Sequence, residues 1–152
     1  MEVNLVYQAS LDGYTADNMW SKVENKGNCL ILVKTKEGVR FGGYRSVPFK
    51  KDNNYQPDLE AFLFSLDHHL KASLKKGNTE RYAIYDHQTR HVTYGGGHDL
   101  GIFTPCNSNQ SNYSNLGHTF APPPEFTGTK NCFLAGKYKF FVEEMEIFSL
   151  SY

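Results

Sequence analysis

The chain has 152 residues, of which 39% are hydrophobic and 21% are charged. A chain of this length can bury about 70% of its unfolded surface, so we expect a single domain over residues 1–152 whose core needs no disulfide or metal. Sixteen basic and sixteen acidic residues cancel without forming long blocks of one sign. This pattern argues against nucleic acid or anionic lipid as a partner.

The first elements are a strand and an amphipathic helix. Residues 3–8 alternate well enough for a strand, and Asp12-Gly13 turns the chain after it. From residue 15 to residue 24 the apolar side chains recur at i, i+3, i+4 and i+7, which places one helical stripe against a sheet. The stripe consists of Ala16, Met19, Trp20 and Val23.

A β-hairpin comes next. Residues 29–33 form a continuous apolar run rich in branched side chains, and residues 39–44 follow it after a turn around Gly38. A strand that is apolar at successive positions is typical of the middle of a sheet. We therefore expect the first strand of this hairpin to be central and apolar on both sides.

The segment after the hairpin is expected to contain a loop, a strand and a helix. Residues 50–57 are polar and predict a loop, whereas residues 61–66 predict another buried strand. Leu70 and Leu74 are four positions apart behind Asp67, a capping residue. This spacing predicts a short helix over residues 67–76.

A second hairpin and two long loops follow. Residues 82–85 and 91–94 flank a turn, and residues 100–103 continue as the next strand. Residues 107–115 are rich in Asn and Ser, and residues 122–128 begin with three prolines. Both of these stretches are expected to be surface loops.

The last strand changes phase. Phe140 and Val142 are apolar at even positions, whereas Met145 and Ile147 are apolar at odd ones. A β-bulge near Glu143-Glu144 would keep all four on the core side, and it would turn Glu144, Glu146 and Phe148 outward. Together the elements predict an α+β protein with two packed, mainly antiparallel β-sheets, a β-sandwich with one or two short flanking helices.

The glycine clusters predict architecture. No Lys-Ser or Lys-Thr follows Gly95-Gly96-Gly97, and the next residues predict a strand, so no helix N-terminus is offered to a phosphate. We therefore expect no nucleotide or other cofactor. Glycine suits a positive φ or a close backbone approach, and the residues interpreted in this way are Gly13, Gly42, Gly43, Gly95, Gly96, Gly97 and Gly136.

The histidines do not match a known metal-site motif. His87 and His91 have the i, i+4 spacing of a zinc site, but they belong to a predicted hairpin, and Gln88 stands where a zinc hydrolase needs Glu. A cluster of His87, His91, His98 and Asp99 stays open sterically, against the alternative of solvated imidazoles. The sequence shows no catalytic signature, so we assign no catalytic or metal-binding residue.

The three cysteines also bear on location. Cys29, Cys106 and Cys132 are an odd number at unrelated spacings, which is typical of a reducing compartment. Cys106 follows Pro105 at a loop edge and is the candidate for a reactive thiol. Residues 1–15 lack the pattern of a secretory leader, and no apolar run approaches the roughly 20 residues of a membrane helix. We expect a cytoplasmic protein that does not insert into a membrane, either free or held on an organelle or in a larger complex.

Taken in order, these landmarks resemble the TLDc domain of the oxidation-resistance proteins. The resemblance covers the chain from Leu5 to Phe148, with departures at Leu11, where the family usually has Arg, and at Phe49, where it usually has Trp. The matching segments are Leu5-Val6-Tyr7 with Asp12-Gly13, residues 30–34 with Phe41-Gly42-Gly43-Tyr44, Val47-Pro48-Phe49, residues 62–65, residues 94–100, residues 113–117, Leu134-Ala135-Gly136 and residues 144–148.

The resemblance implies a two-sheet domain without an accepted catalytic centre. It also implies protection against oxidative stress and, as in several members, binding to the vacuolar proton-pumping ATPase. We accordingly expect a non-catalytic protein-interaction domain whose partner is a vacuolar ATPase subunit or another large complex. The polar groups expected near the interaction surface are His98, Asp99, Glu144 and Glu146.

Two other functions stay open from the sequence. The chain could be a structural subunit of a cytoskeletal or organellar complex, because a stable fold with one suitable patch serves either role. It could also be a weak enzyme that uses the Cys106 thiol or a metal near His98.

Overall fold

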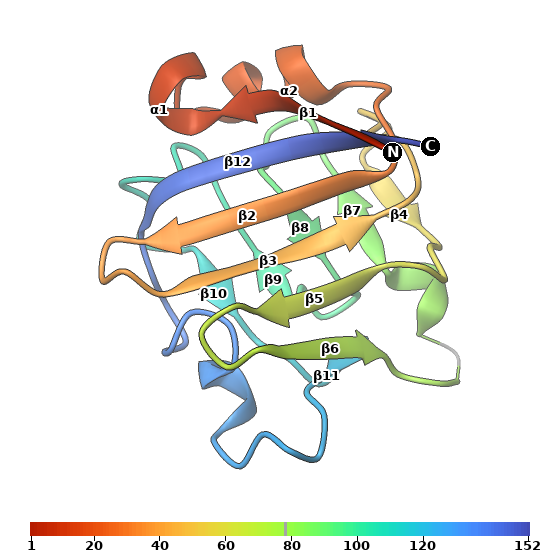
Figure 1. Cartoon of the computed structure of the whole chain (residues 1–152), viewed down its shortest axis with the longest axis vertical. Helices are drawn as coiled ribbons and strands as arrows, with labels where there is room; N and C mark the ends of the chain where they lie inside the picture. Colours follow the sequence, from red (N-terminus) through yellow and green to blue (C-terminus); the bar gives the residue numbers. More distant parts are fainter. Residues whose placement is uncertain (78) are drawn as a thin grey trace.

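Two antiparallel β-sheets pack face to face in the computed structural model, which describes residues 1–77 and 79–152 (Figure 1). Within these residues the larger sheet has seven strands in the order β1-β12-β2-β3-β5-β6-β11, and the smaller has five in the order β10-β9-β8-β7-β4. The helices α1 and α2 lie beside β1 at one edge of the larger sheet (Figure 1). The predicted α+β sandwich is confirmed.

The larger sheet consists of β1 (Glu2–Gln8), β2 (Cys29–Thr35), β3 (Arg40–Arg45), β5 (Phe62–Ser65), β6 (Leu70–Leu74), β11 (Phe120–Ala121) and β12 (Val142–Ser151). The smaller sheet consists of β4 (Asn54–Gln56), β7 (Ile84–Asp86), β8 (Thr93–Tyr94), β9 (Leu100–Gly101) and β10 (Tyr113–Ser114). The helical elements are α1 (Ala9–Asp12), α2 (Ala16–Val23) and the 3₁₀ turns η1 (Glu80–Tyr82) and η2 (Lys130–Cys132).

Helix α2 confirms the predicted amphipathic helix. Thr15 caps it, since the Thr15 side chain accepts a hydrogen bond from the Asn18 backbone N–H and the Asn18 side chain accepts one from the Thr15 backbone N–H. All four residues of the predicted stripe are buried. Trp20 packs edge-on against Phe49 with ring centroids 5.7 Å apart, so the indole anchors the core.

The prediction of a helix over residues 67–76 is wrong. Residues 70–74 form β6, which pairs antiparallel with β5 from Ser65↔Leu70 to Phe62↔Ser73. Asp67 caps no helix and instead accepts hydrogen bonds from the backbone and side chain of Arg40. The leucine spacing that favoured a helix also fits alternation, because Ala72 is buried between exposed neighbours.

Three short strands escaped prediction. Strand β4 lies in the segment predicted as the polar loop 50–57, β10 lies at the end of the Asn/Ser-rich loop, and β11 lies just before the proline-rich loop. Each has only two or three residues, and each is defined by its pairing with a distant partner. Sequence periodicity carries no signal at that length.

The predicted phase slip in the last strand is confirmed. Val142 pairs with Thr35 of β2 while Glu144 pairs with the adjacent Lys34, so Glu143 is the extra residue of a bulge. Met145 and Ile147 are fully buried, and Glu146 between them lies on the other side of the sheet. The bulge therefore decides which side chains reach solvent.

A buried ion pair joins the two sheets. Arg45 at the end of β3 donates to both carboxylate oxygens of Asp86 on β7, at 2.8 and 2.7 Å, and both side chains are about 97–98% buried. Arg45 also stacks on the Phe49 ring at 3.8 Å from its centroid. Lys50 N and Gln56 Nε2 complete the shell of Asp86, so each charge is compensated as burial requires.

We expect Asp86→Ala to lower the free energy of unfolding by about 3–5 kcal/mol, because it leaves a buried guanidinium unpaired. The matched control is Asp67→Ala at the exposed Arg40–Asp67 pair, for which we expect a loss of less than about 1 kcal/mol. Urea unfolding monitored by Trp20 fluorescence measures both. Equal losses of unfolding free energy in the two variants would show that the buried pair matters no more to stability than the exposed one.

Gly42 allows close contact between strands. A Cβ on Gly42 would lie 2.0 Å from the Ile31 backbone oxygen and 2.6 Å from the Phe64 ring, whereas on Gly101 the nearest atoms are side-chain carbons at 3.3 Å. Because backbone cannot move aside as a side chain can, we expect Gly42→Ala to lower the free energy of unfolding by about 3 kcal/mol and Gly101→Ala by about 1 kcal/mol. Similar melting curves for the two variants would refute this.

Candidate interaction surface

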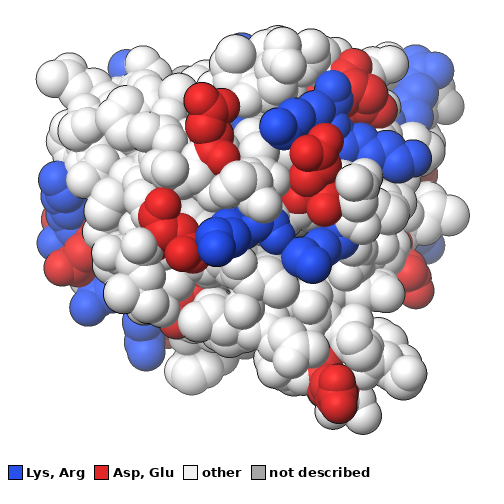
Figure 2. Space-filling model, turned by 90° about the horizontal axis from the view of Figure 1, so that it is seen from above, with Lys and Arg blue, Asp and Glu red and all other residues white. Residues whose placement is uncertain are grey.

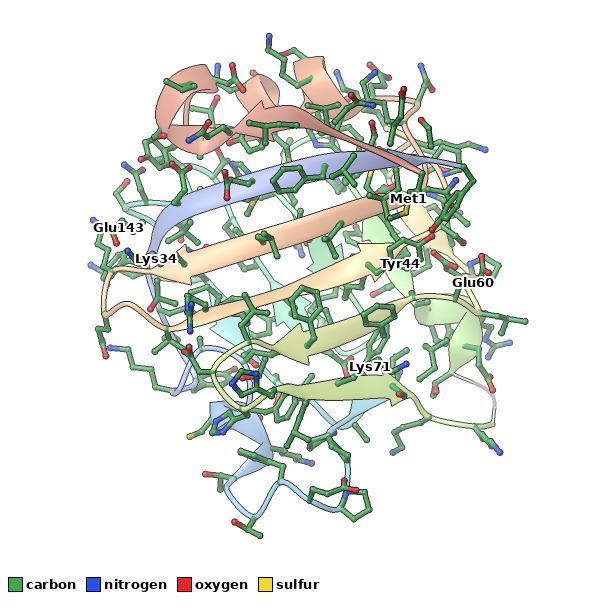
Figure 3. The ribbon with its side chains drawn as sticks, viewed as in Figure 1. Met1, Lys34, Tyr44, Glu60, Lys71 and Glu143 are labelled. Atoms are coloured by element: carbon green, nitrogen blue, oxygen red, sulfur yellow. The ribbon has the colours of Figure 1, made fainter. Side chains whose placement is uncertain are left out.

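The solvent side of the larger sheet is apolar. None of the described helices crosses it, and its side chains stand free in front of the strands (Figures 1 and 3). The registers of β1, β12, β2, β3 and β5 place ten apolar side chains on this side, outside the buried core cluster. This surface, called the outer face below, consists of Val3, Leu5, Leu30, Leu32, Tyr44, Phe62, Phe64, Leu66, Phe148 and Leu150.

Aromatic rings form the middle of the outer face. Tyr44 and Phe62 stack with ring centroids 5.5 Å apart, and Phe64 follows at 6.1 Å from Phe62. Val3 and Leu5 at the β1 side are 53% and 47% exposed. An exposed apolar patch of this kind marks an interaction site more often than a monomer surface.

Charged side chains border the outer face at the tip of the β2–β3 hairpin. Together with Leu32, Val33 and Leu66, they line a shallow cavity of about 180 Å³. The charged members are Lys34, Arg40, Glu144 and Glu146. Two of the acidic residues predicted for the interaction surface therefore lie here.

Glu144 is tied to the neighbouring helix. Its Oε1 accepts hydrogen bonds from Ser10 N at 3.1 Å and Met145 N at 3.0 Å, and Gln8 Nε2 lies 3.5 Å from Oε2. Partial burial opposes ionisation, but hydrogen bonds from Ser10, Met145 and Gln8 outweigh it and lower the pKa of Glu144. Glu144 thus holds α1 against β12.

Glu146 is the freer of the two carboxylates. It lies opposite Leu32 on one side and Gln8 on the other. Among the described residues it has no hydrogen-bond or ion-pair partner. A partner could therefore use its charge without first breaking an internal contact.

His98 belongs to the other side of the molecule, near the smaller sheet. Its Nε2 lies 3.2 Å from Tyr55 Oη, and its Nδ1 lies 3.1 Å from Arg90 Nη1. Burial and the positive charge of Arg90 lower the pKa of His98. The neutral imidazole is therefore the favoured form in this network.

Asp99 is not on the surface, contrary to the prediction. It is fully buried, and its Oδ2 accepts the backbone N–H groups of Gly117, Thr119 and Phe120 at 2.9–3.2 Å. A Cβ on Gly95 would lie 2.0 Å from its Oδ1, so the glycine makes room for the carboxyl group. Burial raises the pKa of Asp99 despite the opposing backbone hydrogen bonds. Asp99 secures a loop and cannot contact a partner.

The four predicted residues consequently do not form one surface. Glu144 and Glu146 border the outer face of the larger sheet, His98 lies by the smaller sheet and Asp99 is internal. The aromatic residues of the outer face were not singled out from the sequence. The sequence signal for Phe62 and Phe64 was the continuous apolar run at residues 61–66, since a strand covered on only one side needs apolar residues only at alternate positions.

Cys106 does not fit the expectation of a reactive thiol. It is fully buried, and burial raises its pKa to about 12. Cys29 is equally buried, with a pKa raised to about 11 by the same cause. Only Cys132 is partly exposed. A thiolate, which carries cysteine reactivity, is therefore disfavoured at Cys106.

The histidines do not converge on a common point. His91 is buried, its Nε2 lies 2.7 Å from the Tyr14 oxygen, and burial lowers its pKa to about 4. His87 Nδ1 instead contacts Thr89. Across residues 1–77 and 79–152, no three His, Cys, Asp or Glu side chains are arranged to hold a metal ion.

Charge is mixed on the face that carries α1 and α2. Figure 2 shows the side that carries α1 and α2, where Lys and Arg are interspersed with Asp and Glu and neither sign dominates. In the described part of the chain, no helix has the length and apolar character needed to cross a membrane.

Comparison with known proteins agrees with this architecture. Residues 1–151 match the family model described as the TLDc domain. The chain therefore belongs to the TLDc domain family.

The chain is also similar to proteins named MTOR-associated protein MEAK7. The Gallus gallus protein is 26% identical over 151 residues, which cover 96% of this chain and 31% of the relative. The Xenopus laevis protein is 25% identical over 150 residues with the same coverage, and the Homo sapiens protein is 22% identical over 154 residues, 32% of its length. The chain thus spans about a third of the curated relatives it matches.

We expect a maleimide reagent to modify Cys132 of the native chain and to leave Cys29 and Cys106 unmodified until the protein is unfolded, because only Cys132 is partly exposed. Peptide mass spectrometry before and after addition of urea measures the modified fraction of each thiol. Rapid native labelling of Cys106 would restore it as a reactive group.

Proposed function

We propose that this chain is a non-catalytic TLDc interaction domain over residues 1–152 that docks on the vacuolar proton-pumping ATPase and thereby contributes to protection against oxidative stress. Membership of the TLDc family supports the proposal. The relatives named as MTOR-associated support the coarser part of it, the binding of another protein. A cytoplasmic location follows from the proposed partner.

One observation carries the proposal. The outer face presents partly exposed aromatic and aliphatic side chains on paired strands, beside the Glu146 carboxylate, which has no ion-pair partner among the described residues. Catalysis would need convergent acid, base or nucleophilic groups, whereas an interaction domain needs such an apolar surface with a charged rim. The buried thiol at Cys106 also counts against the thiol-dependent alternative.

We expect Glu146→Arg to reduce co-purification of pump subunits with the tagged chain by about tenfold, equivalent to about 1.4 kcal/mol of binding, while the melting temperature holds. Glu125→Arg is the matched control, because Glu125 is an exposed acidic residue in a loop away from the outer face. Co-purification measured by quantitative mass spectrometry tests the pair. An unchanged yield with Glu146→Arg would remove this residue from the proposed surface.

Two further measurements separate the alternatives. Fractionation of the source cell would place a structural subunit with cytoskeletal or organellar material that lacks the pump. Replacement of Cys29, Cys106 and Cys132 together would abolish oxidant protection if a thiol carried it. Undiminished protection in that triple variant is the outcome expected for an interaction domain.

A further inference from the structure

A partner that binds the outer face can contact side chains but finds no free backbone hydrogen-bonding groups. β2, β3 and β5 are each hydrogen-bonded to strands on both sides, and β12 pairs with both β1 and β2. A segment laid across these strands therefore finds no free N–H or C=O group opposite it. An extended segment would bury its own backbone groups without partners, which costs free energy.

An α-helix avoids this cost, because its backbone groups are satisfied internally. The apolar rows of the outer face also have the dimensions of one helix. Leu5, Phe148, Leu30, Tyr44 and Phe62 follow one another across five adjacent strands. At a strand spacing of about 4.8 Å this row is about 19 Å long, the length of about 13 helical residues.

Two charges of opposite sign stand at the ends of the neighbouring row. That row runs from Glu146 on β12 through Leu32, Gly42 and Phe64 to Lys71 on β6. The Lys71 ammonium lies over the Phe62 ring at 4.8 Å, and Figure 3 shows Lys71 on the viewer's side of β6.

The three charged side chains on the hairpin side of this row are already engaged. Glu144 binds the start of α1, Arg40 pairs with Asp67 at 3.0 Å, and Lys34 lies 3.7 Å from Glu143. Among the described residues, neither Glu146 nor Lys71 has an ion-pair partner. A partner's charges can therefore meet these two side chains at the ends of the row.

We infer that the outer face is the docking site of an amphipathic α-helix from a partner protein, seated across β12, β2, β3, β5 and β6. Its apolar stripe covers Leu30, Leu32, Tyr44, Phe62 and Phe64. It carries a basic side chain over Glu146 and an acidic one over Lys71. The two are about 11 or 14 residues apart, the spacings near 19 Å that bring both side chains to the same face of a helix with 3.6 residues per turn. The inference rests on the proposed function and specifies the kind of element that the domain binds.

A second copy of the chain fits this surface less well. Two such faces stacked on each other would also cover the charged row formed by Glu144, Lys34 and Arg40. Even a paired charge loses its hydration when it is buried, and this desolvation can cost more free energy than the pair returns. A helix about 10 Å wide can cover the apolar rows and leave that charged row in water.

The test is a selection for binding segments. Segments of about 20 residues, long enough for a docked helix of this span, are displayed from the proteome of the source cell and selected on the full 152-residue chain. Selected peptides are then titrated with the protein by fluorescence anisotropy and circular dichroism. The variants are Leu32→Gln on the outer face and, as the matched control, Leu11→Gln on α1, where Leu11 is 78% exposed.

The expected peptides have apolar residues at helical spacing and gain helicity on binding. Their affinity falls about tenfold or more with Leu32→Gln and is unchanged with Leu11→Gln. Glu146→Lys and Lys71→Glu each weaken binding while the melting temperature holds.

Several results would overturn the inference: peptides with strand periodicity, no peptide that depends on Leu32, or a concentration-dependent dimer that Leu32→Gln abolishes in sedimentation. None of these results bears on co-purification with the pump. If no pump subunit co-purified with the chain but helical peptides still bound the outer face, the proposed function would be refuted and the docking site would remain supported.

Discussion

The ion pair between Arg45 and Asp86 is the constraint on which the relation of the two sheets depends. It is the place where a charged group of β3 meets a charged group of β7 with water excluded. Replacing such a pair by apolar side chains often leaves stability unchanged. Its effect is therefore best understood as fixing geometry: a guanidinium with two aligned acceptors accepts one orientation, whereas an apolar contact tolerates sliding.

That geometry leaves one side of the larger sheet without cover. The inner sides of the two sheets pack on each other, and the bulge at Glu143 keeps Met145 and Ile147 in that core. Every second residue of the same strands then points outward. On β2 these residues are Leu30 and Leu32, so a strand that is apolar on both sides is buried on only one. The outer face exists because the strands are apolar on both sides, whereas the smaller sheet covers only one of them.

The sequence predicted the features that depend on local periodicity and missed those decided by distant contacts. The stripe of α2, the hairpin of β2 and β3 and the slip in β12 all appear as apolar patterns within a few residues. Asp99 and Cys106 could not be placed in this way. Each is polar or reactive in a loop, and each is buried because remote chain closes over it, residues 117–120 for Asp99 and β12 for Cys106. The strand β6 was mistaken for a helix because its leucine spacing fits both structures.

An exposed apolar sheet face carries a risk of nonspecific association, and the charges around it limit that risk. Glu146 and Lys71 stand at opposite ends of one row, and Lys34 and Arg40 border the hairpin tip. Charged residues beside an apolar strand oppose sheet-to-sheet stacking, because stacking would remove them from water. Glu146 and Lys71, which have no ion-pair partner among the described residues, are compatible with a partner that supplies a base and an acid at the matching separation. A single arrangement of side chains thus disfavours unselective stacking and favours one complementary helix.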